Sequence, residues 1–266
     1  MTGRSVALRL DDVGAASKRH EVYGLTRLRV GPLALPFPGN LLVLKYLPPI
    51  KHWGPYRELS ASEWEAILTA LERADARMTV AITAGWVETD GIITPFPQKF
   101  PDAAAVIRQG VRRARIEVAN HGYTHCVLRD GLFRPRLFAG NREAHREFHD
   151  WLPAETHRDH VCRAQDILEQ FFGVRVVTFV PPGNVFSRTT LEVAAGAGIR
   201  YVSCLDPGRY GAVAGLSWVG GDDVVAIHDR DLVLDGMATL HRLLEGRVAP
   251  FVAVREVGER LVGGAR

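Results

Sequence analysis

The chain has 266 residues, of which 47% are hydrophobic, and it carries a formal net charge of +3. This apolar content is ample for a buried core, and the length suits one large α/β domain, since such folds often reach about 250 residues without dividing. The positive charge is spread along the chain with no basic run of five or more residues, which argues against a nucleic-acid partner.

The first residues are polar, and they contain no apolar stretch that could act as a signal sequence or cross a membrane. The three cysteines are too few and too scattered for a disulfide framework, which agrees with a reducing compartment. We therefore expect a cytoplasmic protein with no membrane partner.

Short β-rich runs alternate with helical patterns along the chain. The predicted strands cover residues 6–10, 78–83, 116–119, 174–180, 201–204 and 224–227. The predicted helices cover residues 61–74, 102–114, 154–172, 189–197 and 237–245. This alternation is typical of a parallel sheet with helical crossovers. With no internal repeat or linker, we predict one domain over residues 1–266, an α/β fold of the closed or nearly closed (β/α) barrel type. A doubly wound open sheet is the alternative.

Polar or turn-forming residues follow four of the predicted strands. Chemistry in parallel barrels collects at these carboxyl ends. The four groups are Asp11 and Asp12, His121 and His125, Pro181 to Asn184, and His228 and Asp229. Each group could also be purely structural, as a turn or a helix cap. If none of the groups were functional, four such structural interpretations would all have to be correct at once.

His121 and His125 are four residues apart, a spacing that on one helical turn points both imidazoles the same way. Two such imidazoles make two sides of a metal site, and a third ligand with an open position for water would make it catalytic. A spaced pair of histidines alone is more often a histidine-rich loop, so another strand end must supply a carboxylate.

In these motifs the chain resembles the polysaccharide deacetylases, metal-dependent N-deacetylases with a NodB homology domain folded as a distorted (β/α) barrel. Four motifs carry the resemblance: Arg9-Leu10-Asp11-Asp12, His121 to His125, Phe179 to Gly183, and Ala226-Ile227-His228-Asp229. The stretch from Tyr201 to Asp206 is a weaker match to the family's fourth motif, whose aspartate orients the catalytic histidine. Asp206 is the candidate for that role.

The resemblance implies roles for individual residues. Asp12, His121 and His125 would hold a divalent metal, most simply Zn²⁺. Asp11 would be the general base and His228 the general acid that protonates the leaving amine. A backbone N–H near Gly183 would stabilise the oxyanion, and the neighbouring Pro182 and Asn184 would support the substrate.

One departure from the family pattern concerns an arginine of the third motif, which holds the catalytic aspartate. That position falls on Phe179 here. Arg9 lies two residues before Asp11, so both side chains leave the same face of the first strand. We predict that Arg9 contacts Asp11 and keeps it ionised. The alternative is that Arg9 pairs with another acid for structural reasons.

A second departure is the long connection over residues 15–59, which we predict to be a loop insertion. It carries Phe37, Trp53 and Tyr56 together with Lys45 and Lys51. These residue types can stack on a sugar ring and meet an anionic group, and we expect Trp53 to contact the substrate. The alternative is a loop that only plugs the barrel mouth.

Four further histidines, His145, His149, His157 and His160, could be offered as another metal site. The charged residues between them instead favour a solvated face. The sequence therefore predicts a metal-dependent hydrolase that removes an acyl group, most simply acetyl, from an amino sugar in a small molecule or oligosaccharide. The alternatives are hydrolysis of a ring amide or ureide, and a catalytically silent carbohydrate-binding barrel.

Overall fold

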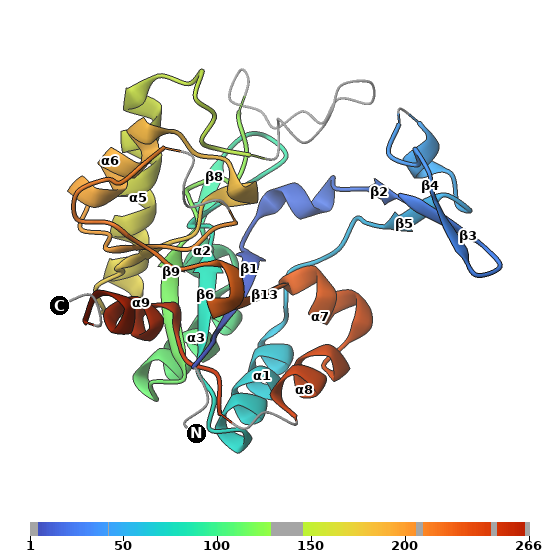
Figure 1. The fold of residues 1–266 in the computed structure, drawn as a ribbon. Helices are drawn as coiled ribbons and strands as arrows, with labels where there is room; N and C mark the ends of the chain where they lie inside the picture. The colour runs from blue at the N-terminus through green and yellow to red at the C-terminus, as the bar shows by residue number, and fades with distance from the viewer. Residues whose placement is uncertain (1–4, 42, 129–145, 206–209, 246–248, 264–266) are drawn as a thin grey trace.

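A curled parallel sheet of seven strands forms the centre of the computed structural model, which describes residues 5–41, 43–128, 146–205, 210–245 and 249–263 (Figure 1). In spatial order the strands are β12 (Ser217–Trp218), β11 (Tyr201–Val202), β10 (Thr178–Phe179), β9 (Ile116–Asn120), β6 (Met78–Ile82), β1 (Ala7–Val13) and β13 (Val224–His228).

The strand order is that of a barrel. From β1 the strands follow the chain in one direction, and the last strand, β13, pairs with the other edge of β1. Among the described residues no pairing joins β12 to β13, so the sheet is a half-barrel open on that side. The predicted α/β barrel is confirmed, and the doubly wound alternative is not observed.

The helices lie where local sequence signals place them. Their bounds are α1 (Ala61–Arg73), α2 (Phe96–Lys99), α3 (Pro101–Arg112), α5 (Ala154–Phe172), α6 (Arg188–Gly196), α7 (Asp229–Asp235), α8 (Ala238–Leu244) and α9 (Val254–Gly263). A capping box of Ser60 and Glu63 begins α1, and Gly173 ends α5 with a φ of 70°. Six of the described α-helices and strands outside residues 15–59 were not predicted: α2, α7, α9, β7 (Gly85–Val87), β8 (Ile93–Pro95) and β12. The strand predicted over 174–180 is longer than the observed β10. No helix among the described residues has the length and apolarity to cross a membrane.

Side-chain parity along β1 separates the core from the barrel interior. Leu8 and Leu10 are fully buried in the main hydrophobic cluster, which the helices α1 and α3 share. The alternate residues Arg9 and Asp11 leave the opposite face, on which Ala81 belongs to a small separate cluster. The interior of the half-barrel therefore holds polar side chains.

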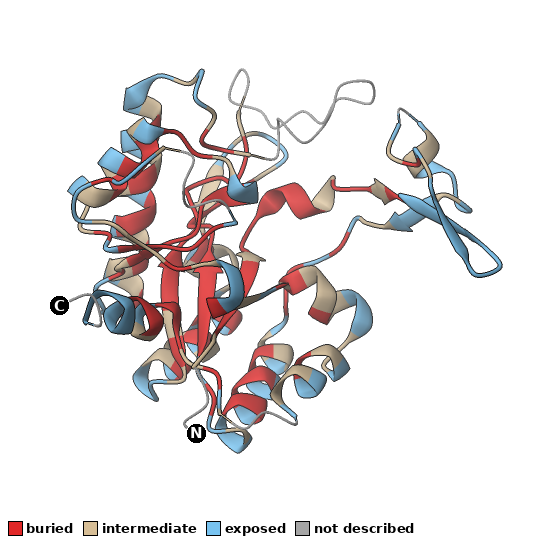
Figure 2. Cartoon of the chain, in the orientation of Figure 1, coloured by how far each residue is buried: buried red, intermediate tan, exposed pale blue. Residues whose placement is uncertain are grey.

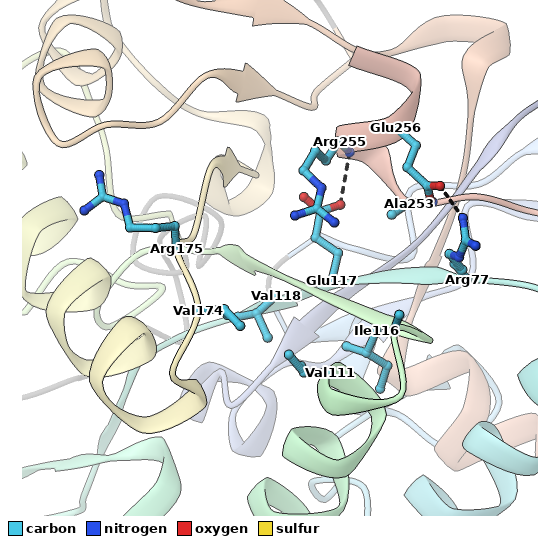
Figure 3. Close-up of a pocket in the computed structure, with 11 residues that line it drawn as sticks. Arg77, Val111, Ile116, Glu117, Val118, Val174, Arg175, Ala253, Arg255 and Glu256 are labelled. Carbon is cyan, nitrogen blue, oxygen red and sulfur yellow. Dashed lines mark hydrogen bonds and ion pairs between the residues drawn. The ribbon is translucent and has the colours of Figure 1, made fainter. Parts of the chain in front are cut away.

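A cavity of about 200 Å³ lies at the amino-terminal ends of the strands (Figure 3). The half-buried Glu117 in this cavity accepts hydrogen bonds from Thr79 Oγ1 at 2.6 Å, Thr178 Oγ1 at 2.6 Å and the Arg255 backbone N–H at 3.1 Å. Burial raises the pKa of Glu117, and these donors oppose the rise. This end of the sheet is closed by polar contacts between β6, β9, β10 and α9.

Residues 15–59 form defined structure instead of the predicted loop. After η1 (Ala16–Arg19), a projection built from β2 (Tyr23–Gly24), β3 (Arg27–Val30), β4 (Leu33–Pro36), η2 (Leu44–Tyr46) and β5 (Lys51–Trp53) extends away from the sheet (Figure 1). In it β2 pairs with β5 and β3 with β4, both antiparallel. We call residues 22–56 the arm. The arm does not plug the barrel mouth.

Candidate metal centre and active site

The end of β1 brings two adjacent carboxylates to one cleft. Successive side chains of a regular strand point to opposite faces. Here the pairing of β1 with β6 shifts between Leu10 and Val13, and Asp12 has a φ of 69°. This irregularity turns Asp12 toward the cleft that Asp11 also lines. A bulge in β1 therefore directs both carboxylates into the same cleft.

His121 and His125 lie in a tight loop after β9, not on a helical turn. The backbone has left-handed φ values of 79° at Gly122 and 57° at His125, so the helical reason for their common direction is wrong. Their rings still meet, with centroids 4.9 Å apart. A Cβ at position 122 would come within 2.1 Å of Glu147 Oε2, which explains the glycine between them.

Glu147 organises this loop from beneath. Its carboxylate accepts hydrogen bonds from the backbone N–H groups of Tyr123 at 2.9 Å, Thr124 at 3.1 Å and His125 at 2.9 Å. His160 Nδ1 lies 2.5 Å from Oε1 of the same carboxylate. Burial opposes ionisation, but His160 and these N–H groups lower the pKa of Glu147. Nothing in the local sequence distinguishes Glu147 from its charged neighbours.

The solvated face predicted for this segment is present only in part: Glu155, Arg158 and Asp159 are exposed, whereas Glu147 and His157 are buried. Glu147 lies under the histidine loop, and His157 Nδ1 lies 2.8 Å from Thr190 Oγ1 of α6. His145 lies outside the described residues. Among those that are described, the remaining histidines of the group form no metal-binding cluster.

Asp12, His121 and His125 converge on one point. Asp12 Oδ1 lies 3.3 Å from His121 Nε2 and 3.1 Å from His125 Nε2, and one ligand atom from each residue lies within 4.8 Å of the others. Burial opposes ionisation of Asp12, but hydrogen bonding and charge from the two histidines hold its pKa well below the usual value.

The donor set fits a divalent cation. His121 Nδ1 lies 2.6 Å from the Val180 carbonyl oxygen, which fixes a proton on Nδ1 and leaves the Nε2 lone pair directed at the cluster. Neither ring nitrogen of buried His125 forms a hydrogen bond of regular geometry among the described residues, although Nε2 lies 3.1 Å from Asp12 Oδ1. A metal ligand bond would satisfy Nε2.

Arg9 holds Asp11 by two hydrogen bonds. Arg9 Nε lies 2.8 Å from Asp11 Oδ1, and Arg9 Nη2 lies 2.8 Å from Oδ2, with both side chains buried. The contact predicted from strand parity is therefore present. The third nitrogen, Nη1, donates to Ser203 Oγ at 2.7 Å, so a residue just beyond β11 fixes the guanidinium. Ser203 was not among the site residues predicted from the sequence.

His228 ends β13 directly beside Asp11, its register partner on β1. Its backbone N–H donates to Asp231 Oδ2 at 3.0 Å, and its Nδ1 lies 3.8 Å from the same oxygen. Burial lowers the pKa of His228, but Asp231, Asp12 and Asp11 together raise it to about 9. Asp231 was missed, although an acid three residues after a helix cap is a recognisable spacing.

The third-motif loop borders the same cleft, whose volume is about 130 Å³. Pro181, Gly183 and Asn184 line it, whereas Pro182 is buried beneath them. The Asn184 side chain accepts a hydrogen bond from the Leu205 backbone N–H at 3.1 Å. Phe179 is fully buried against Phe148, so the position of the family's arginine is part of the core.

Trp53, one of the predicted supporting residues, does not line the cleft itself. Asp206 is outside the described residues. Trp53 stacks on Tyr23 with ring centroids 4.3 Å apart, and the Arg230 guanidinium lies 4.6 Å from the Trp53 ring. Tyr23 and Arg230 line the cleft, so Trp53 supports its rim through them.

A buried ion cluster connects the base of the arm to the residue after His228. Lys18 is fully buried and forms ion pairs with Glu58, at 2.6 Å, and with Asp229. The Tyr56 hydroxyl also donates to Asp229, at 3.1 Å. Burial opposes the charge of Lys18, but the two carboxylates raise its pKa, so it remains a cation. This cluster holds Asp229, the residue next to His228, against the base of the arm.

Comparisons with known proteins identify the family to which the chain belongs. The family model for polysaccharide deacetylase matches residues 54–202, more than half of the chain. No curated protein sequence matches the chain. Among solved structures, one assigned as a polysaccharide deacetylase from Mycobacterium smegmatis is 14% identical with a TM-score of 0.49, and the match covers 76% of this chain and 78% of that one.

Two other solved structures are similar at the same distant level. A CE4 family pseudoenzyme from Bacillus anthracis is 15% identical with a TM-score of 0.47, over 74% of this chain and 61% of that one. A family 4 carbohydrate esterase from Streptomyces lividans, in complex with acetate, is 18% identical with a TM-score of 0.43, over 69% of this chain and 80% of that one.

Proposed function

Because the chain belongs to the polysaccharide deacetylase family, whose members are hydrolases of amide C–N bonds, we propose that it removes the N-acetyl group from an amino sugar. The substrate would be an N-acetylated amino sugar in an oligosaccharide, a polymer or a related small molecule. The observation that carries the proposal is the convergence on one cleft of five side chains from the ends of β1, β9 and β13, which belong to one sheet: Asp11, Asp12, His121, His125 and His228.

Asp12, His121 and His125 would hold a divalent cation, most simply Zn²⁺, because one carboxylate and two imidazoles suit that ion. When bound, such an ion polarises the acetamide carbonyl and lowers the pKa of water. The chain's own residues must then position the substrate and move the protons.

Asp11 is the general base in this proposal. Arg9 fixes both oxygens of Asp11 in one orientation, from which the carboxylate can accept a proton from water. The water oxygen forms the new C–O bond, and the amide C–N bond breaks. Arg9 thus does from β1 what an arginine of the third motif does elsewhere in the family.

His228 is the general acid that protonates the departing nitrogen, so that an amine and acetate leave. Its raised pKa keeps it protonated through neutral pH. Asp231 fixes the backbone before α7, and the backbone N–H of Gly183, a residue that also lines the cleft, would donate to the oxyanion.

Acetate release from N-acetylated chito-oligosaccharides by metal-loaded protein tests the proposal. Asp11→Asn keeps the size of the side chain but cannot accept the proton, so turnover should fall about 10²-fold or more while the metal content stays at one ion per chain. Near-normal turnover in Asp11→Asn would move the base elsewhere. Sugar binding without acetate release in the unchanged protein would favour a silent carbohydrate-binding barrel.

A further inference from the structure

Exposed apolar side chains are concentrated on the arm. Between residues 28 and 47, the large apolar side chains left exposed are Leu28, Val30, Leu33, Leu35, Leu41, Val43, Tyr46 and Leu47. Figure 2 shows most of the arm as exposed, standing away from the buried interior of the sheet and helices. Soluble monomers rarely leave a contiguous apolar patch of this kind in water, so this surface requires a partner.

The β3–β4 hairpin has one aliphatic face. Leu28 pairs with Leu35, and Val30 with Leu33, so these four side chains lie on the same side of the ribbon. Val30 and Leu33, next to the turn, are 62% and 64% exposed. An isolated two-stranded hairpin is marginally stable at best in water, so a surface that covers this face would also order the hairpin.

The charge of the arm indicates what that surface is. Residues 22–56 contain four basic side chains, Arg27, Arg29, Lys45 and Lys51, and no aspartate or glutamate. The arm alone therefore exceeds the net charge of +3 of the whole chain. Arm-to-arm packing between two copies would bring like charges together, and sugars stack on aromatic rings rather than on leucine and valine. Aliphatic side chains beside cations suit an anionic lipid surface.

We propose that the arm docks on the surface of a membrane that contains anionic lipids. The aliphatic face of the hairpin enters the boundary between headgroups and acyl chains. Arg27 and Arg29 leave the other face, and their long stems let the guanidinium groups reach lipid phosphates around the edge of the ribbon. From the sequence we expected no membrane partner, because we found no membrane-spanning segment. A contact with the membrane surface does not require such a segment.

Docking would place the cleft close to the membrane surface. The root of the arm includes Tyr23, which lines the cleft, and Trp53, which packs against it and against Arg230. The inference does not rest on the proposed deacetylation, because binding is measured without turnover.

Vesicle sedimentation tests the proposal with the full chain. Vesicles of phosphatidylcholine with about 30% phosphatidylglycerol should bind the protein at least about tenfold more tightly than phosphatidylcholine alone. Raising the salt from about 0.1 M to about 0.5 M should release most of the protein, because screening weakens the attraction of exposed charges. Absence of binding to the anionic vesicles would overturn the proposal.

Two variants separate the apolar from the electrostatic contribution. Val30→Ser with Leu33→Ser, and separately Arg27→Gln with Arg29→Gln, should each weaken vesicle binding about tenfold or more. The matched control is Ile92→Ser with Leu234→Ser, which changes exposed aliphatic residues outside the arm and should bind as the unchanged protein does.

Circular dichroism would verify that the variants fold, and the charge variant leaves the aliphatic face intact. Vesicle binding that neither arm variant weakens would place the contact elsewhere and overturn the proposal. Light scattering supplies another contrary outcome. A dimer that Val30→Ser with Leu33→Ser converts to a monomer, without vesicle binding by either form, would show that the face covers a second copy of the chain.

Discussion

At the amino-terminal end of the sheet, Glu117 accepts three hydrogen bonds and lies beside Arg255 (Figure 3), whereas at the carboxyl end neither ring nitrogen of buried His125 forms a hydrogen bond of regular geometry among the described residues. Each end holds a carboxylate beside an arginine. They differ in whether the polar atoms are already satisfied. A saturated polar group closes a barrel, but convergent groups with free lone pairs can bind and react.

The largest expected effect comes from removing the His125 imidazole. His125→Ala should abolish stable metal binding and reduce turnover to background, because it deletes one of the three proposed ligands. Elemental analysis after dialysis measures the metal content, and acetate release measures turnover. Full metal content in this variant would show that the ion is held elsewhere.

The next effect concerns the general acid. A group with a pKa near 9 is protonated below that pH, so turnover by the unchanged protein should decline on the alkaline side. His228→Gln cannot donate the proton and should lower turnover about 10²-fold or more, with the alkaline decline lost. The pH profile of acetate release between pH 6 and about 10 checks both expectations. An alkaline decline that persists in the variant would assign it to another group.

Glu147→Gln should weaken metal binding about 10- to 100-fold by disturbing the loop that carries both histidines. Backbone N–H groups point at both oxygens of Glu147, so either orientation of the amide leaves a donor facing a donor. Competition with a chelator measures the affinity without reference to turnover.

The matched control for that change lies at the other end of the sheet. In Glu117→Gln the amide NH₂ can replace Oε1, because the Thr178 hydroxyl can turn and accept. Metal affinity and turnover should stay unchanged. A loss of metal affinity in Glu117→Gln equal to that in Glu147→Gln would mean that both act through general destabilisation.

The smallest effect is expected at Arg9. Arg9→Met keeps most of the stem but removes both hydrogen bonds to Asp11, so the carboxylate loses its fixed orientation. Turnover should fall about tenfold, with the metal content unchanged. Unchanged turnover in a folded, metal-loaded variant would leave Arg9 a structural role only.

The α/β repeat, the strand ends that carry the candidate site and the contact between Arg9 and Asp11 could be predicted from the sequence. Each of these follows from local periodicity, since a strand alternates its faces and parallel strands bring their carboxyl ends together. The sequence also placed α5 at residues 154–172, as the structure has it, because a long amphipathic pattern ends at Gly173.

The support of the candidate site by Glu147 and the strands of the arm became visible only in the three-dimensional structure. Glu147 looks like a surface charge in the sequence, yet it is buried because three backbone N–H groups of a loop 22 to 24 residues away converge on it. The arm looks like a long loop because its strands are short and its apolar residues face no core of their own. Both features depend on partners distant along the chain, which local periodicity does not encode.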